Sequence, residues 1–173
     1  AKRWSGFPKY NFVGGHNDGA AVPVQDFIEA AAAVLKREGT TLATYSLESG
    51  SQGYLPLRDY LAGFLNKTTG MTDTADDILL VSGSLQALDL VNDVLLAEGD
   101  TVVLEEAAYQ GAIQRFNRLG VTGIGAPLDE GGIRMDTLSN ILDDLKKDGI
   151  KPKYLYAVPT VQNPTGTVMT EER

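Results

Sequence analysis

Small residues form the first stretch of the chain that could do chemistry, the turn Ser-Gly-Ser at positions 82–84. An apolar run, residues 78–81, precedes the turn, and a helical pattern over residues 84–97 follows it, so the sequence predicts strand, tight turn and helix. The first N–H groups of a helix lack intrahelical acceptors and lie at the positive end of its dipole. The turn could therefore cradle a phosphate, although an ordinary helix cap would have the same composition.

Two further stretches carry residues suited to binding. Asn163 lies in Gln-Asn-Pro-Thr-Gly, residues 162–166, where Pro159 and Pro164 stiffen the backbone and an X-Pro bond could be cis. A rigid Asn at a strand end could bond a ligand oxygen, or it could close an Asx turn on its own backbone. Tyr109 follows another predicted strand, and its ring could cover a flat ligand or pack on the sheet edge.

Alternating strands and helices are predicted to position these residues. The expected strands are 78–81, 101–104, 121–125 and 153–158, and the expected helices are 24–38, 56–67, 84–97, 109–119 and 136–148, with a further helix beginning at 170. This order predicts an α/β fold with a mostly parallel sheet flanked by helices. The loops 82–85, 105–109 and 159–166 would leave the carboxyl ends of its strands, where such sheets bind ligands.

Composition excludes several classes of function. The 173 residues include no cysteine and one histidine, so disulfides, thiolate chemistry and His-rich metal sites are ruled out. The net charge of −8 argues against non-specific binding to nucleic acid or anionic membranes. His16, in a glycine-rich loop, is expected to be an ordinary surface residue. No apolar run approaches membrane-spanning length and no secretory signal is recognised, so we expect a cytoplasmic protein.

Three motifs together resemble one known family. SGSLQALDL (82–90), EEAAYQGAI (105–113) and VPTVQNPTG (158–166), in this order, are similar to the large domain of class I/II aminotransferases. These are fold-type-I enzymes that depend on pyridoxal 5′-phosphate. The branch that the sequence most resembles holds the 2-aminoadipate and aromatic aminotransferases and the MocR-type regulators, and FVGG (12–15) and GYLPLR (53–58) extend the resemblance upstream.

The resemblance implies roles for five residues of the three motifs. Backbone N–H groups of Gly83, Ser84 and Leu85 would hold the cofactor phosphate. Only a backbone contact is carried over for Leu85, because the family commonly has Gln there. Tyr109 would stack on the pyridine ring, and Asn163 would bond the phenolic oxygen of that ring.

The same resemblance implies a partner. Tyr45 would reach the phosphate in the neighbouring subunit, which implies a homodimer with shared active sites, although its loop departs from the usual pattern by the extra residues 49–51. Gly15 would lie against the substrate carboxylate, or would be a plain loop glycine. Arg58 is expected to hold the start of a helix rather than bind an anion.

The expected function is transfer of an amino group between an α-amino acid and a 2-oxo acid. We expect an N-terminal arm with helices over 1–70 and the first part of the cofactor-binding domain over 71–173. No residue matches the family's Schiff-base lysine, so we expect an N-terminal portion that is inactive alone. The alternatives are a C–S lyase, the non-catalytic domain of a MocR-type regulator, for which residues 1–23 contain no winged helix, and an inert fragment.

Overall fold

The structure is a computed structural model that describes residues 6, 10, 15, 18–44 and 48–173. Its contacts divide the chain into two compact units, residues 1–80 and 81–173. We describe each unit by itself. Across the described ranges, no helix has both the length and the apolar character needed to cross a membrane.

The first unit is helical. Its α-helices are α1, Val24–Glu38, and α2, Leu55–Thr69, and its short 3₁₀ helices are η1, Gly19–Ala21, η2, Gly39–Ala43, and η3, Ala75–Asp77. The structure confirms the predicted extent of α1 and places the start of α2 one residue before Pro56. Gly70 ends α2 in the left-handed conformation, φ 74°, which a glycine adopts without strain.

Arg58 holds the start of α2, as the sequence predicted. Its side chain is buried, and Nε donates to Gly53 O at 3.0 Å. The guanidinium also donates to Ala75 O at 2.6 Å and to Ser49 O at 2.8 Å. Because these acceptors come from the loop before α2 and from η3, Arg58 fixes local structure and has little freedom to bind a ligand.

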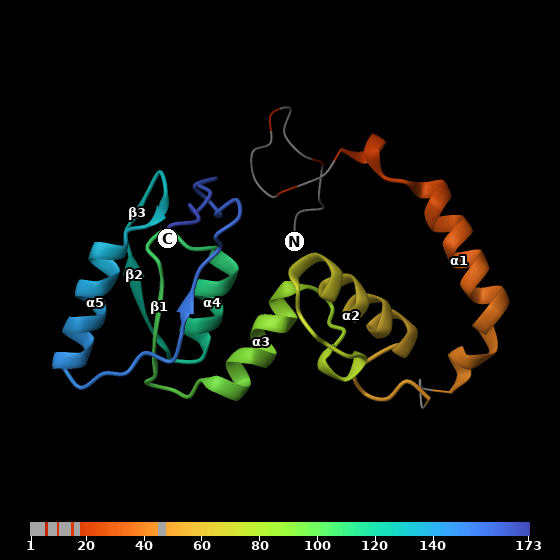
Figure 1. The fold of residues 1–173 in the computed structure, drawn as a ribbon, viewed down its shortest axis with the longest axis horizontal. Helices are drawn as coiled ribbons and strands as arrows, with labels where there is room; N and C mark the ends of the chain where they lie inside the picture. The colour runs from red at the N-terminus through yellow and green to blue at the C-terminus, as the bar shows by residue number, and fades with distance from the viewer. Residues whose placement is uncertain (1–5, 7–9, 11–14, 16–17, 45–47) are drawn as a thin grey trace. The chain divides into compact units, whose positions relative to one another are not determined.

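The second unit contains a three-stranded parallel sheet in the order β2-β1-β5 (Figure 1). The strands are β1, Thr101–Glu105, β2, Thr122–Ala126, and β5, Leu155–Tyr156. Val103, in the centre of β1, pairs with Ile124 on one side and Leu155 on the other. A small antiparallel hairpin, β3 Leu128–Asp129 and β4 Gly132–Ile133, was not predicted.

Helices cover both faces of this sheet. They are α3, Ser84–Leu95, α4, Gln110–Arg118, and α5, Met135–Lys147, with α4 and α5 on opposite sides (Figure 1). Side chains alternate along a strand, so Val102 and Leu104 pack with Phe116 of α4 while Val103 packs with Leu138 of α5. The parallel α/β architecture predicted from the sequence is confirmed.

Two of the predicted strands differ from expectation. Residues 78–81 form no strand: Ile78 is extended, but the segment's one backbone bond to another described segment runs from Leu80 N to Gln52 O, 2.9 Å. A strand needs a ladder as well as apolar residues, and the described chain provides none there. β5 is shorter than predicted, and at its carboxyl end Val158 N donates to the Glu105 carboxylate rather than to a backbone carbonyl of β1.

One predicted helix start differs. Asp136 does not cap α5; Arg134 occupies the cap position, and Asp136 lies inside the first turn, 2.7 Å from the Arg134 guanidinium. Residues 170–173, where the sequence predicts that a further helix begins, form a turn closed by Arg173 N donating to Thr170 O at 3.1 Å, and that helix stays a prediction.

A buried hydrogen bond in the second unit yields a stability prediction. Tyr154 Oη donates to Oδ1 of Asn92, which is fully buried and whose Nδ2 has no partner among the described residues. Tyr154→Phe leaves the whole Asn92 amide unsatisfied, so we expect it to lower the free energy of urea-induced unfolding by about 1–3 kcal/mol. The double variant Asn92→Leu/Tyr154→Phe removes the unpaired groups, so its free energy of unfolding should fall less than that of Tyr154→Phe alone. An equal or larger fall would contradict this account.

Candidate functional site

The turn before α3 has the backbone conformation of an anion cradle. Gly83 immediately precedes the helix with φ 90°, a conformation that only glycine adopts readily. A Cβ built on Gly83 would meet nothing within 4 Å. The glycine is therefore required by backbone geometry and not by crowding, and the space in front of the helix is open.

Three backbone donors of this turn are free. Ser82 N donates to Oε1 of Gln86 at 2.5 Å, and Gln86 N donates to Gly83 O at 3.1 Å. Within the described ranges, no acceptor faces the N–H groups of Gly83, Ser84 or Leu85. Three free donors at the positive end of a helix suit a phosphate, so the cradle fits the group that the sequence predicted.

Arg115 holds this turn against α4. Its guanidinium pairs with Asp89 of α3, with Nε 2.7 Å from Oδ1, and Nε also donates to Leu85 O at 3.3 Å. Within α4 it donates to Gly111 O at 3.1 Å. The first turns of α3 and α4 are thereby fixed side by side. Sequence reasoning missed Arg115, because it lies outside the three motifs.

Tyr109 occupies the cap position of α4, at the edge of the core cluster around Phe116. Its ring lies directly against Gly111: a Cβ on Gly111 would come 2.5 Å from Tyr109 Cε1. A side chain at position 111 would therefore displace the ring. Gly111, two residues beyond Tyr109 in the same motif, leaves the space that the ring occupies, and sequence reasoning gave it no role.

Asn163 has a free side chain in the loop after β5. The Asn163–Pro164 peptide bond is cis, and Asn163 is exposed. An Asx turn would need the backbone N–H of Thr165, but that group donates to Gln162 Oε1 at 2.9 Å. No described residue bonds the Asn163 side chain, so the Asx-turn alternative is wrong and the amide is available to a ligand.

The loops with Tyr109 and Asn163 meet at one edge of the sheet. β1 and β5 are neighbouring parallel strands, so both loops leave the same edge, and Gln162 Nε2 donates across to Ala107 O at 2.6 Å. The structure thus brings the loops of Tyr109 and Asn163 together, and the cradle lies in the same unit.

The end of β5 carries a tyrosine whose pKa is shifted. Burial raises the pKa of Tyr156, and the charges of Glu105 and Tyr109 raise it further.

The roles expected of two further site residues, Gly15 and Tyr45, stay predictions. Gly15 is exposed and belongs to the first unit, so its relation to the cradle is not defined. Tyr45 lies outside the described residues, as does His16. In the described part of the chain, no three His, Cys, Asp or Glu side chains gather as they would around a metal ion.

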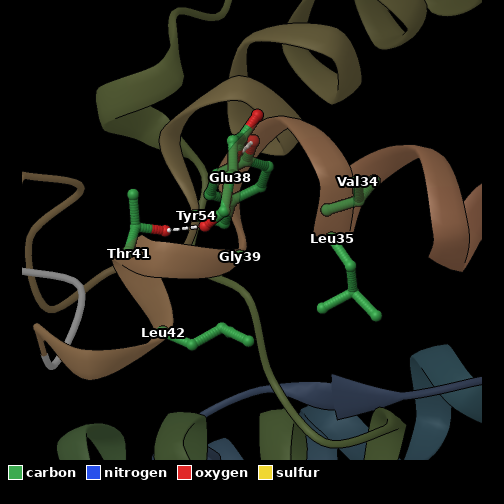
Figure 2. A pocket seen from close by; sticks show the side chains of 7 residues that line it. All are labelled: Val34, Leu35, Glu38, Gly39, Thr41, Leu42 and Tyr54. Carbon is green, nitrogen blue, oxygen red and sulfur yellow. Dashed lines mark hydrogen bonds between the residues drawn. The ribbon is translucent and has the colours of Figure 1, made fainter.

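An apolar pocket of about 290 Å³ lies within the first unit (Figure 2). Its lining comes from α1, η2 and the residue before α2: Val34, Leu35, Glu38, Gly39, Thr41, Leu42 and Tyr54. Its polar groups bond to each other, since Tyr54 Oη donates to the Glu38 carboxylate and Thr41 Oγ1 donates to Glu38 O at 2.8 Å. The Tyr54 bond and Arg37 hold the pKa of Glu38 below its usual value. The pocket offers a ligand few free polar partners.

Comparison with known proteins identifies the family. The family model for aminotransferase class I and II matches residues 9–173. The chain belongs to this family, and its fold is that of the pyridoxal-phosphate aminotransferases.

Individual relatives support this family assignment. The chain is 35% identical over 151 residues to aromatic-amino-acid aminotransferase 1 of Thermococcus litoralis, covering 87% of this chain and 36% of the relative. It is similar to the crystal structure of the α-aminoadipate aminotransferase LysN of Thermus thermophilus, complexed with N-(5′-phosphopyridoxyl)-L-leucine, with TM-score 0.79, 35% identity, and coverage of 92% of this chain and 37% of that one.

A third relative is an uncharacterized HTH-type transcriptional regulator of Bacillus subtilis. It is 36% identical over 122 residues, which cover 70% of this chain and 24% of the relative. The 173-residue chain thus spans little more than a third of the two aminotransferases and about a quarter of the regulator.

The contact between Gly111 and Tyr109 predicts a substitution effect whose size depends on the background. Gly111→Ala should gain little or lose up to about 1 kcal/mol, because the new methyl group overlaps the Tyr109 ring and the flexible side chain must shift its rotamer. In a Tyr109→Ala background the same change should stabilise by up to about 1 kcal/mol, the ordinary advantage of alanine over glycine in a helix. Chemical unfolding of the four proteins measures both effects, and destabilisation in both backgrounds would contradict the contact.

Proposed function

We propose that this chain supplies the phosphate- and ring-binding part of a pyridoxal-phosphate-dependent aminotransferase, which transfers an amino group between an α-amino acid and a 2-oxo acid. One observation carries the proposal: three free N–H groups at the start of α3 lie in the same unit as a fixed tyrosine and an unbonded asparagine. Membership of the aminotransferase family supports it.

In this proposal the cradle binds the phosphate through its backbone. The N–H groups of Gly83, Ser84 and Leu85 donate to phosphate oxygens, and the α3 dipole adds to the attraction. The turn is already held by Gln86 and by Arg115, so binding requires little ordering of the chain. Glycine at position 83 permits the φ of 90° that this turn requires.

Tyr109 and Asn163 bind the ring. The phenol ring of Tyr109 stacks on one face, and the free amide of Asn163 donates to the phenolic oxygen, which favours the anionic form of that oxygen. When bound, pyridoxal phosphate supplies an electron sink for charge that develops at the substrate α-carbon. We propose that a Schiff-base lysine, an aspartate for the ring nitrogen and an arginine for the substrate carboxylate belong to other parts of a longer protein.

We further propose that the protein is a cytoplasmic homodimer with shared active sites. Tyr45 would reach the phosphate bound in the neighbouring subunit, and Gly15 would lie beside the substrate carboxylate. The net charge of −8 supports the absence of nucleic-acid and membrane partners. Cross-linking and gel filtration of the longer protein test the dimer.

The relative in Bacillus subtilis favours a second candidate function. Its similarity over 122 residues supports the effector-sensing domain of a MocR-type regulator, which would use the same cradle without catalysis. The two functions differ in what the whole protein contains. A DNA-binding domain upstream of residue 1 would favour the regulator, and aminotransferase activity of the longer protein would favour the enzyme.

The stacking role predicts weaker cofactor binding in one variant. In the longer protein, Tyr109→Ala should raise the dissociation constant of pyridoxal phosphate roughly two- to tenfold, the loss expected for one aromatic stack. Equilibrium dialysis measures it. Tyr60→Ala is the matched control, since that tyrosine is 67% exposed in the first unit. Unchanged affinity in Tyr109→Ala, or an equal loss in the control, would refute the role.

The Asn163 bond predicts a spectral shift. Asn163→Ala removes the donor that favours the anionic phenolic oxygen, so the pH midpoint of the bound cofactor's absorbance change should rise in the longer protein. Asn66→Ala, which removes a side chain that bonds Asp73 in the first unit, serves as the control. A midpoint identical to that of the unsubstituted protein would show that Asn163 does not bond the ring.

A further inference from the structure

Gln162 is the buried member of an otherwise exposed loop. Its side chain is 3% exposed, whereas its neighbours Val161 and Asn163 are both exposed, Val161 to 63%. A buried amide loses its hydrogen bonds to water and destabilises the fold unless protein groups replace them. Gln162 therefore needs a complete set of partners inside the second unit.

The structure provides that set. Nε2 of Gln162 donates to Glu105 Oε2 at 2.9 Å and to Ala107 O at 2.6 Å. Oε1 accepts from Thr165 N at 2.9 Å and from Thr165 Oγ1 at 2.7 Å. Both donors and both acceptor positions of the amide are used, and the two donor bonds cross to a different segment of the chain.

Glu105 ties the same amide to the sheet. It is the last residue of β1 and is 1% exposed. Its second oxygen accepts from Val158 N at 3.1 Å, just beyond β5. A buried carboxylate needs donors of this kind, and Gln162 provides the one side-chain donor among its described partners. The pair therefore locks the end of β1 to the loop after β5.

The two loops joined in this way are those that carry the ring-binding residues. Ala107 is two residues before Tyr109, and Gln162 is adjacent to Asn163. Gln162 also takes the Thr165 N–H that would otherwise be open to Asn163. The amide thus sets the spacing of the two loops and leaves the Asn163 side chain free.

We propose that Gln162, acting through Glu105, is a positioning residue that holds Tyr109 and Asn163 in register for the cofactor ring. The inference rests on the proposed function, because it assigns Gln162 an effect on the ring-binding residues. It extends that function by naming a residue that touches no ligand and yet determines how the ring is held. Arg115 has no part in it, since that side chain holds the phosphate turn.

The test is Gln162→Glu in the longer protein. This change keeps the size of the side chain and replaces both donors by a carboxylate that faces Glu105 and Ala107 O. Above the pKa of the new carboxyl we expect the dissociation constant of pyridoxal phosphate to rise about tenfold or more relative to the unsubstituted protein. Circular dichroism of the bound cofactor, which reports ring orientation, should change as well.

The pH profile distinguishes positioning from general damage. As the pH falls, the new carboxyl binds a proton and regains one donor, so the affinity ratio of the variant to the unsubstituted protein should return toward one. The titratable side chain that the described structure places against it is Glu105, whose charge acts in turn on Tyr156, and both are also present in the unsubstituted protein. A ratio that stays constant with pH would overturn the proposal.

Thr165→Val is the matched control. It removes the hydroxyl's bond to the same amide and its two bonds to Thr167, but all three lie within the loop and none joins the two segments. Its cofactor affinity should stay within about threefold of the unsubstituted protein, with unchanged circular dichroism; a change as large as in Gln162→Glu would overturn the proposal.

Glu105→Gln covers the case in which Gln162→Glu does not fold. This isosteric change sets two amide donors against each other and should alter the dichroism in the same direction, with a smaller loss of affinity. If Gln162→Glu or Glu105→Gln folds and leaves both the affinity and the dichroism unchanged, the positioning role of Gln162 is refuted. The proposed function would still stand. Failure of the unsubstituted longer protein to bind pyridoxal phosphate would refute the proposed function and the inference with it.

Discussion

The burial of β1 is the constraint on which the second unit depends. All five residues of the strand are buried, so it must be covered on both faces and paired on both edges. α4 and α5 supply the faces, and β2 and β5 supply the edges. Once β1 is enclosed, the loop that follows it can lie only at the carboxyl end of the sheet. The loop after β5 leaves the same end, so the two loops lie side by side. The position of the candidate site follows from how the strand is covered.

Much of this arrangement could be predicted from local patterns. Helix α1 shows its periodicity, and strand β1 its apolar run, within a single window of sequence, and glycines such as Gly70 and Gly83 mark the backbone at helix ends. The cradle, Tyr109 and Asn163 stand within recognisable motifs at strand ends. Local signals suffice where the determining neighbours are within a few residues.

The remainder depends on contacts that no local window contains. Residues 78–81 have the composition of a strand, but pairing is decided by a neighbour distant in sequence, and the described chain offers none. The sequence alone places Gln162 in a turn. Its bond to Glu105, 57 positions away, is visible only in the structure. The same holds for Arg115 and Leu85, which are 30 positions apart. Hydrogen bonds between residues distant in sequence are therefore the part of the site that the sequence did not predict.

The free groups of the candidate site have a common physical origin. At the cradle, the Gln86 side chain accepts from Ser82 N and closes the turn, so the N–H groups that follow can face outward. In the loop after β5, Gln162 accepts from Thr165 N, so Asn163 does not bond its own backbone. In each case a glutamine meets the local backbone requirement that would otherwise use up the binding group. A group beside a satisfied turn can bind a ligand without first breaking an internal bond, and this is the form of preorganisation that the two loops share.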